Sequence, residues 1–308
     1  MKHFISITDT PTQELLHVLE VSRSLRAQRG KPGAAQSSLL TGQTLAMIFE
    51  KPSLRTRASF ERAIVELGGH AMVMHQGEVG LGKRERPADV ARVLSGMVQG
   101  IMARVFEHQK LIELAQYSSV PVINALSDYS HPCQALADAL TMTDEFGPDL
   151  RGRTMAFVGD GNNVARSLAV ICGKLGMNFI LAAPKGYQLE SNLAQRLRTV
   201  TEEIKIEAID DPFAAVKHAD VIYTDTWVSM GQENQAQTRT QVFEKYQVNG
   251  ELVAGAPKHA IVLHCLPAYR GCEITEDVLE GPQSRAFPQA HNRLHAQKGL
   301  LAVLMGTL

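Results

Sequence analysis

The sequence is poor in the residues that mark several common protein classes. It has one tryptophan, four cysteines and 6% aromatic residues in 308 positions. No two cysteines form a Cys-x-x-Cys pair, which argues against a zinc ribbon or a disulfide framework and favours a reducing compartment. No run of about 18 apolar residues occurs, and the first residues lack the apolar core of a signal peptide. We therefore expect a soluble, cytoplasmic protein with no membrane partner.

An excess of charge of either sign is also missing. The chain carries 31 basic and 32 acidic residues, for a formal net charge of −1. Such a balance gives no general field to attract nucleic acid or an anionic membrane, so nucleic acid is not an expected partner. Any site for an anion must therefore be local.

Apolar strand-like runs alternate with amphipathic helix-like segments along the whole chain. The expected strands are 45–49, 71–74, 101–106, 120–125, 154–158, 178–183, 205–208, 221–224 and 260–265. The expected helices are 11–29, 54–67, 87–98, 110–117, 133–146, 164–175, 189–200, 212–218 and 290–304. The alternation predicts an α/β fold of two doubly wound parallel-sheet domains, with the ligand crevice between them beyond the carboxyl ends of the strands. Gly147-Pro148 is the expected boundary.

A strand, a tight turn and a helix follow one another in the segment 45–67. The apolar run ends at Lys51-Pro52-Ser53, and apolar residues then recur at helical spacing. The turn therefore lies at a helix N-terminus, where unpaired backbone N–H groups favour an anion. The sequence Ser-Leu-Arg-Thr-Arg at 53–57 adds hydroxyl and guanidinium donors suited to phosphate. It also fits a serine N-cap followed by two solvated arginines, and spacing alone does not decide.

Two further polar groups interrupt apolar segments of the first half. Arg104 lies in the run 101–106, either as an edge-strand residue or as a donor to a carbonyl or phosphate oxygen. The run 131–134, His-Pro-Cys-Gln, precedes a helix and can be a simple cap, because proline suits a first turn. His131 and Gln134 can also bond a carbonyl oxygen and an amide there, as an oxyanion hole does.

A glycine-containing turn at 159–163 invites a dinucleotide interpretation. It follows a strand and opens a helix, but Val164 stands where G-x-G-x-x-G requires its third glycine. The next strand-like run also ends without an acidic residue for a ribose. A nicotinamide cofactor is therefore not expected.

Two other strand ends in the second half carry chemically useful side chains. Asp225 follows the run 221–224, where it can pair with a substrate ammonium or form an Asx-type turn. Ser229, farther along that loop, can reach a carboxylate. The run 264–267, His-Cys-Leu-Pro, contains a cysteine that is either an inert buried thiol, the usual state of a free cysteine, or part of a site.

Together these motifs resemble one family. Ser-x-Arg-Thr-Arg, His-Pro-Cys-Gln, Ser-Met-Gly at 229–231, His-Cys-Leu-Pro and Asn-Arg at 292–293 follow the order and spacing of the aspartate/ornithine carbamoyltransferase family. The Ser-Met-Gly loop resembles that of its ornithine branch. The motifs extend from residue 53 to residue 293, so the resemblance covers essentially the whole chain.

The resemblance implies a role for each half and for each matching position. Residues 1–146 would bind carbamoyl phosphate, with the closing helix at about 290–308 packed back on them, and residues 147–289 would bind ornithine. The implied carbamoyl-phosphate residues are Ser53, Leu54, Arg55, Thr56, Arg57, Arg104, His131, Pro132, Cys133, Gln134, Cys265, Leu266 and Arg293. The implied ornithine residues are Asn163, Asp225, Ser229 and Met230, and the implied catalytic residues are Arg104, His131, Asp225 and Cys265.

The resemblance also implies the reaction. The carbamoyl group of carbamoyl phosphate would pass to the δ-amine of L-ornithine, giving L-citrulline and phosphate in arginine biosynthesis, with no metal, cofactor or covalent intermediate. Only the neutral amine is nucleophilic, and it is the minority form of a group with a pKa of about 10.4. Asp225 would bind the α-ammonium, while Cys265 and the backbone near Leu266 would accept hydrogen bonds from the δ-amine. A homotrimer, or a multiple of trimers, with sites shared between subunits is implied as well.

Three positions depart from the family pattern. Leu54 stands where a threonine is usual, which it shares with carbamoyltransferases of acylated ornithine. Gly80 stands where many relatives carry a glutamine that reaches a neighbouring subunit, and Lys83 and Arg84 are the candidates to replace it. His291 stands where glutamate often precedes the Asn-Arg pair.

The sequence leaves three alternatives open. A carbamoyltransferase acting on putrescine or an N-acylated ornithine is disfavoured by the Ser-Met-Gly loop. An NAD-dependent oxidoreductase is disfavoured by Val164. A catalytically inactive homologue is disfavoured because the expected arginine, histidine, aspartate and cysteine residues are all present.

Overall fold

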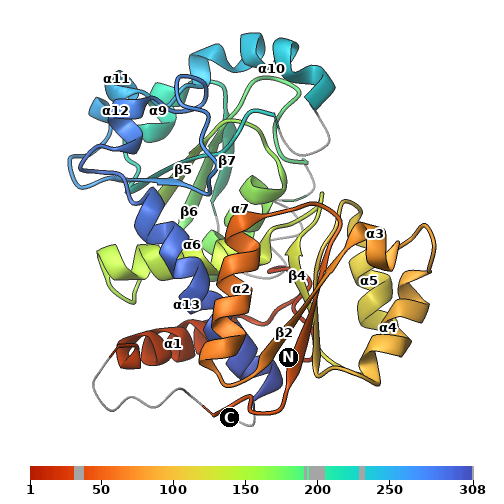
Figure 1. The fold of residues 1–308 in the computed structure, drawn as a ribbon. Helices are drawn as coiled ribbons and strands as arrows, with labels where there is room; N and C mark the ends of the chain where they lie inside the picture. Colours follow the sequence, from red (N-terminus) through yellow and green to blue (C-terminus); the bar gives the residue numbers. More distant parts are fainter. Residues whose placement is uncertain (31–37, 191–192, 194–204, 229–232, 307–308) are drawn as a thin grey trace. The chain divides into compact units, whose positions relative to one another are not determined.

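The computed structural model describes residues 1–30, 38–190, 193, 205–228 and 233–306. The chain divides into two compact units, of which the first is Met1–Leu140 with His291–Leu308 and the second is Thr141–Ala290. Each unit contains one parallel β-sheet with α-helices packed on it, which confirms the predicted fold class (Figure 1). In the part of the chain that is described, no helix combines the length and the apolar character needed to cross a membrane.

The first unit is built on a four-stranded sheet in the order β2-β1-β3-β4. Its strands are β1 (Thr44–Phe49), β2 (His70–His75), β3 (Gly100–Arg104) and β4 (Val122–Leu126). Its helices are α1 (Thr12–Gln28), α2 (Leu54–Glu66), α3 (Gln76–Val79), α4 (Pro87–Ser95), α5 (His108–Tyr117), the start of α6 (Pro132–Phe146) and most of α13 (Ala286–Met305). The central strands β1 and β3 are buried over most of their length because helices cover both faces of the sheet.

The second unit contains a five-stranded sheet in the order β7-β6-β5-β8-β9. Its strands are β5 (Thr154–Val158), β6 (Asn178–Ala182), β7 (Ile206–Ile209), β8 (Val221–Thr224) and β9 (Ile261–His264). Its helices and 3-10 turns are α7 (Asn163–Lys174), α9 (Pro212–Val216), η1 (Glu233–Gln235), α10 (Ala236–Phe243), η2 (Glu244–Tyr246), α11 (Gly250–Ala254) and α12 (Glu276–Leu279).

Both sheets reverse their strand order next to a central strand. In the first unit the chain moves outward from β1 to β2 and then returns to β3 on the other side of β1. In the second unit it moves outward from β5 to β7 and returns to β8. The carboxyl ends of strands at such a switch point are the usual place for a ligand in an open α/β sheet. We therefore expect ligand-binding residues in the loops after β1, β3, β5 and β8.

Most predicted elements agree with the structure, and the differences lie at their ends. The final helix was expected to start at residue 290 but starts at Ala286. The glycine-rich segment at 76–83, for which no element was expected, opens with α3, since His75 and Glu78 form a capping box there. The expected helix 189–200 lies almost entirely outside the described residues.

The final helix packs within the first unit, as the resemblance implied. Lys298 on α13 donates to Glu66 at the end of α2 over 3.1 Å, and both side chains are buried. Glu66 also accepts from Arg29 at 3.0 Å and from Arg62 at 2.8 Å. Burial raises the pKa of Glu66, but these three donors outweigh burial, so its pKa lies below the usual range. This carboxylate joins α1, α2 and α13.

We expect Lys298→Met to destabilise the protein by about 1.5–3 kcal/mol, the usual value of a hydrogen bond to a charged group. Glu66 keeps Arg29 and Arg62, so the loss stays below that of a fully isolated buried charge. Urea unfolding at pH 7.5 measures the effect. Lys258→Met, at an exposed position, is the matched control. Equal stability of the two variants would contradict the role assigned to this contact.

His295 on α13 makes the stability depend on pH in a predictable direction. Burial lowers its pKa to about 4, and the charges of Arg26 and Arg29 act in the same direction. Between about pH 6.5 and pH 4, His295 is protonated in the unfolded chain but remains neutral in the folded chain. The free energy of unfolding therefore decreases as the pH falls through this range. In urea titrations, His295→Gln should lose less stability than the parent between pH 7 and pH 5, whereas the exposed-site variant His218→Gln should behave as the parent. Identical slopes in all three proteins would show that His295 does not contribute.

Candidate active site

The parallel sheet of the first unit brings three sequence motifs to one edge. Phe49 at the end of β1 is aligned with Arg104 at the end of β3, and Arg104 is aligned with Leu126 at the end of β4. Arg104 is the last residue of β3. The turns 50–53 and 127–131 directly follow the carboxyl ends of β1 and β4, so all three segments lie at the same edge of the sheet. This explains why residues far apart in the sequence can surround one ligand.

Thr56 is the centre of a buried polar cluster in this unit. Its side-chain oxygen lies 3.5 Å from Arg104 Nη1 and 3.4 Å from Arg293 Nη2, and it accepts from the Ser53 hydroxyl at 3.1 Å. Thr56 and Arg293 are almost fully shielded from solvent. Ser53 also caps α2, because its hydroxyl oxygen accepts from the Thr56 N–H. Two guanidiniums and two hydroxyls at a helix N-terminus suit a phosphate-sized anion.

His131 lies close to the same arginines. Burial lowers its pKa well below the usual value, and the positive charges of Arg293, Arg104 and Arg55 lower it further. The imidazole is therefore neutral near pH 7. A neutral ring can donate one hydrogen bond to a carbonyl oxygen without carrying a charge of its own.

Gln134 and Arg293 form a second buried contact in the cluster. Arg293 Nη1 donates to Gln134 Oε1 over 2.7 Å, and Gln134 Nε2 donates to Asp138 Oδ1 over 2.8 Å. Sequence patterns did not single out Asp138. The available signal was an acidic residue in an otherwise apolar helical run, four positions after Gln134 and so on the same helix face.

Other residues expected in this site are placed differently. Arg57 is half exposed, and its described partner is Glu61, 3.3 Å away. Leu54 is 79% exposed. Cys133 is fully buried, its thiol donates to the Asn124 carbonyl at 3.3 Å, and burial raises its pKa to about 12, so the thiol is unreactive. From Cys133, a ligand could therefore use only the backbone.

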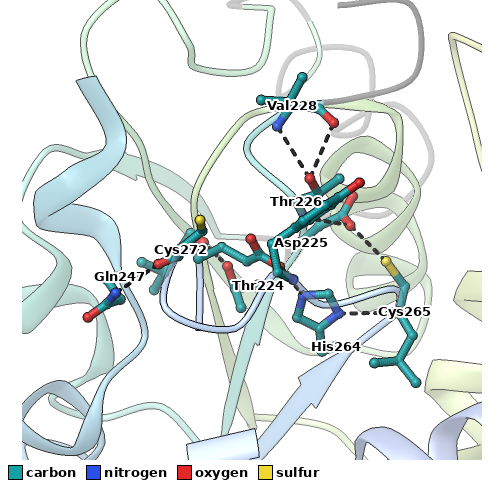
Figure 2. A network of polar contacts seen from close by, with 12 residues as sticks. Thr224, Asp225, Thr226, Val228, Gln247, His264, Cys265 and Cys272 are labelled. Atoms are coloured by element: carbon teal, nitrogen blue, oxygen red, sulfur yellow. Dashed lines mark hydrogen bonds and ion pairs between the residues drawn. The ribbon is translucent and has the colours of Figure 1, made fainter. Parts of the chain in front are cut away.

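In the second unit, Asp225 is the centre of the polar contacts at the carboxyl ends of β5, β8 and β9. It accepts from the Cys265 thiol at 2.9 Å, from the Asn162 amide at 2.9 Å and from the Thr226 N–H at 2.8 Å. Figure 2 shows Asp225 and Cys265 facing each other. A buried carboxylate with three donors around it is well suited to hold a cationic group next to a thiol.

Asp225 has a second carboxylate nearby. Burial raises the pKa of Asp160, the Arg239 guanidinium opposes that rise, and the charge of Asp225 adds to it. Arg239 Nη1 donates to Asp160 Oδ2 and to the Trp227 carbonyl, both at 2.8 Å. Sequence patterns missed this buried pair, because Arg239 follows Asp160 by 79 positions. Two carboxylates against one guanidinium leave this group of side chains negative, which favours a cationic ligand.

The ring of His264 holds the backbone of the His-Cys-Leu-Pro turn. Its Nδ1 accepts from the Leu266 N–H at 2.9 Å, so the ring proton lies on Nε2 and is donated to Glu273 Oε1 at 3.1 Å. His264 and Glu273 are both fully buried, and Figure 2 shows the ring beside Cys265. Leu266 has φ of 55°, a conformation that residues other than glycine rarely adopt. The turn therefore presents Cys265 and Leu266 in a fixed orientation.

The remaining residues expected to bind ornithine are only partly placed. Asn163 is the first residue of α7, and its neighbour Asn162 donates to Asp225. Asn162 also caps α7, as its oxygen accepts from Val164 N–H and Ala165 N–H. Ser229 and Met230 lie outside the described residues.

The glycine-containing turn after β5 is covered by the chain itself. Gly161 donates its N–H to the Tyr187 carbonyl at 2.8 Å, and a Cβ at this position would lie 2.7 Å from the backbone of Gln188 and Leu189. The N–H groups that open α7 are already used by Asn162. A pyrophosphate needs these same donors, so the turn does not suit a dinucleotide. Among the described residues, no group of three or more histidine, cysteine or acidic side chains could hold a metal ion.

The segment around Gly80 explains one departure from the family pattern. Gly80 has φ of 64°, and a Cβ at this position would lie 2.6 Å from the Cβ of Arg84. A glutamine therefore does not fit there without a local rearrangement. Arg84 donates to the Glu78 carbonyl and lies 3.3 Å from Glu85, so its guanidinium is engaged within its own segment.

Comparisons with known proteins support one family. The model of the aspartate/ornithine carbamoyltransferase carbamoyl-phosphate-binding domain matches residues 2–144, and that of the Asp/Orn-binding domain matches residues 151–304. A relative named ornithine carbamoyltransferase from Methanopyrus kandleri is 47% identical, over 99% of this chain and 97% of its own. One named anabolic ornithine carbamoyltransferase, from Pyrococcus furiosus, is 46% identical over 99% and 96%. The solved structure of an ornithine carbamoyltransferase from Pyrococcus furiosus superposes on this chain with a TM-score of 0.94 at 46% identity, covering 100% of this chain and 98% of the other.

Proposed function

The chain belongs to the aspartate/ornithine carbamoyltransferase family, and we propose that it transfers the carbamoyl group of carbamoyl phosphate to the δ-amine of L-ornithine, releasing L-citrulline and phosphate. The family expected from the sequence motifs is thereby confirmed, and the chain is a transferase. The reaction places it in arginine biosynthesis, consistent with the anabolic relative of Pyrococcus furiosus.

The buried cluster around Thr56 is the observation that carries this proposal. Arg104 and Arg293 both contact the Thr56 hydroxyl, and Ser53 supplies a further donor next to it. Carbamoyl phosphate is a small dianion, so its phosphate takes the hydroxyl, guanidinium and backbone donors at the start of α2. Charge-assisted hydrogen bonds are each worth about 1.5–3 kcal/mol, so a few of them bind the phosphate firmly.

The same cluster serves the carbamoyl end. The neutral ring of His131 and the guanidinium of Arg104 donate to the carbonyl oxygen, on which negative charge develops as the amine attacks. Donors fixed in place before the reaction stabilise that charge without reorganisation. The phosphate that leaves is already paired with the arginines, so no metal ion is needed to neutralise it.

The second unit supplies the amine. Asp225 pairs with the α-ammonium of ornithine, and the negative surroundings of Asp160 and Asp225 favour the cationic substrate. The Cys265 thiol donates to Asp225, so the sulfur lone pairs and the Leu266 carbonyl can accept from the δ-amine. Attack requires the neutral amine, held about 3–3.5 Å from the carbamoyl carbon. After the attack, the δ-nitrogen loses its surplus proton to solvent as the phosphate leaves.

We assign the phosphate substrate to residues 1–146 with the final helix and ornithine to residues 147–289. The proposal includes a cytoplasmic location, as the composition led us to expect, and a homotrimer or a multiple of trimers, as the family resemblance implied. Light scattering on the purified chain, whose protomer mass is 33.7 kDa, measures the assembly.

Production of citrulline by the purified chain tests the function directly. Carbamoyl phosphate is supplied with ornithine, putrescine, N-acetylornithine or aspartate, and ureido products are measured colorimetrically. We expect ornithine to give by far the highest kcat/KM. A higher kcat/KM with another amine would reassign the second substrate, and no product with any amine would reject the function.

A further inference from the structure

Asp138 is a buried acid to which the proposed mechanism gives no role. It lies on α6 one helical turn after Gln134 and is fully shielded from solvent. Its Oδ1 accepts a 2.8 Å hydrogen bond from Gln134 Nε2. Burying a carboxyl group costs free energy unless it forms hydrogen bonds, so a buried acid such as Asp138 indicates a structural or functional role.

Asp138 and Arg293 together leave the Gln134 amide only one orientation. The Asp138 carboxyl oxygen accepts from the amide nitrogen, and a guanidinium only donates hydrogen bonds. The amide nitrogen must therefore face Asp138, and the amide oxygen must face Arg293, 2.7 Å away. The flipped amide, which is usually hard to exclude for a glutamine, would place two donors together and two acceptors together.

The fixed amide oxygen can recognise a substrate group. It has two lone pairs, and Arg293 engages it from one direction. The other lone pair can accept from the NH2 of a carbamoyl group. We propose that Asp138 is a positioning residue that locks the Gln134 amide so that its oxygen recognises this NH2, and that it thereby sets the preference for a carbamoyl over an acyl phosphate. The inference rests on the proposed function, because it takes carbamoyl phosphate as the ligand of the first unit.

Two stable phosphonates isolate this contact. Phosphonoacetamide and acetonylphosphonate have the same carbonyl and phosphonate groups, and they differ only in NH2 against CH3. A site built to hydrogen-bond an NH2 discriminates against the analogue that lacks it, because its buried acceptor is then left unpaired. The ratio of the two dissociation constants therefore measures the contact with the NH2 group alone. The dissociation constant of inorganic phosphate measures binding by the residues that hold the phosphate group.

Asp138→Asn is the informative variant. An asparagine can turn its own amide, so it accepts both orientations of Gln134 and leaves Arg293 alone to hold the amide oxygen. By isothermal titration calorimetry on the full-length protein, we expect the preference for phosphonoacetamide to fall about tenfold, as for the loss of one hydrogen bond, while phosphate affinity changes less than about twofold. Each dissociation constant comes from the shape of the titration curve and does not depend on the folded fraction.

Asp144→Asn is the matched control. It makes the same chemical change on α6 at an exposed position, and we expect both phosphonates to bind it as they bind the parent. Gln134→Leu should abolish the preference, and adding Asp138→Asn to that variant should change nothing further. Asp138→Ser repeats the test if the asparagine variant folds poorly.

The outcomes separate this inference from the proposed function. A preference retained within twofold in Asp138→Asn, or an equal loss of affinity for both phosphonates and phosphate, overturns the role of Asp138. Failure of both Asp138 variants to fold also overturns it, since the acid would then serve the core. If the parent protein makes no citrulline, the proposed function itself is rejected, whatever the phosphonates show.

Discussion

Arg104→Met should lower kcat/KM for carbamoyl phosphate by at least about a thousandfold. The guanidinium lies at the carboxyl end of β3, 3.5 Å from the Thr56 hydroxyl, and its charge acts on His131. Removing one preorganised donor to a developing oxyanion costs about 10²–10³ in rate, and the lost charge also weakens phosphate binding. Initial-rate kinetics with both substrates varied measures the effect.

Two comparisons make that result specific to the site. Arg92→Met removes an exposed arginine that contacts Asp89 and the Tyr117 ring, and it should leave the kinetics unchanged. Thermal unfolding establishes that the Arg104 variant is folded. If its kcat/KM stayed within about tenfold of the parent value, Arg104 would not contact the reacting group.

Asp225→Asn should lower kcat/KM for ornithine by at least about a hundredfold. The substitution removes the charge that pairs with the α-ammonium, and it places an amide NH2 where the carboxylate now accepts from Asn162 or Cys265. Loss of one charge-assisted hydrogen bond costs about 1.5–3 kcal/mol, and leaving neighbouring donors without an acceptor adds to it. The KM for carbamoyl phosphate should change less than about threefold, because the residues assigned to that substrate belong to the cluster around Thr56 in the first unit.

The control for Asp225 is Asp210→Asn, at an exposed position of the same unit. It should behave as the parent with both substrates. A loss in Asp225→Asn that is equal for ornithine and carbamoyl phosphate would contradict the division of roles between the two units.

The strand-turn-helix unit around Ser53 shows how much local sequence can predict. The apolar run, the turn residues and the helical spacing predicted β1 and α2, and Ser53 caps α2 as an N-terminal serine should. The alternation of such units predicted both parallel sheets. These features depend on residues within a few positions of one another, and their periodicity is visible in the sequence.

Contacts between distant segments were not predictable in the same way. Arg293 reaches the Thr56 hydroxyl across 237 positions of the chain. The motifs indicated a shared site for these two residues, but nothing in local spacing indicated Asp138 or the Asp160–Arg239 pair. For the same reason, local spacing did not indicate that Asn162 contacts Asp225.

The sequence by itself determined the fold class, the family and the residue types available at the strand ends, because caps, turns and apolar periodicity act over short distances. Tertiary structure decided which side chains meet, and therefore which are buried and how they ionise. His131 is neutral because three arginines and the core surround it, whereas Arg57 in the same motif as Thr56 remains half exposed beside Glu61. The burial and the protonation state of a side chain depend on the residues packed around it, and these are brought together only when the chain folds.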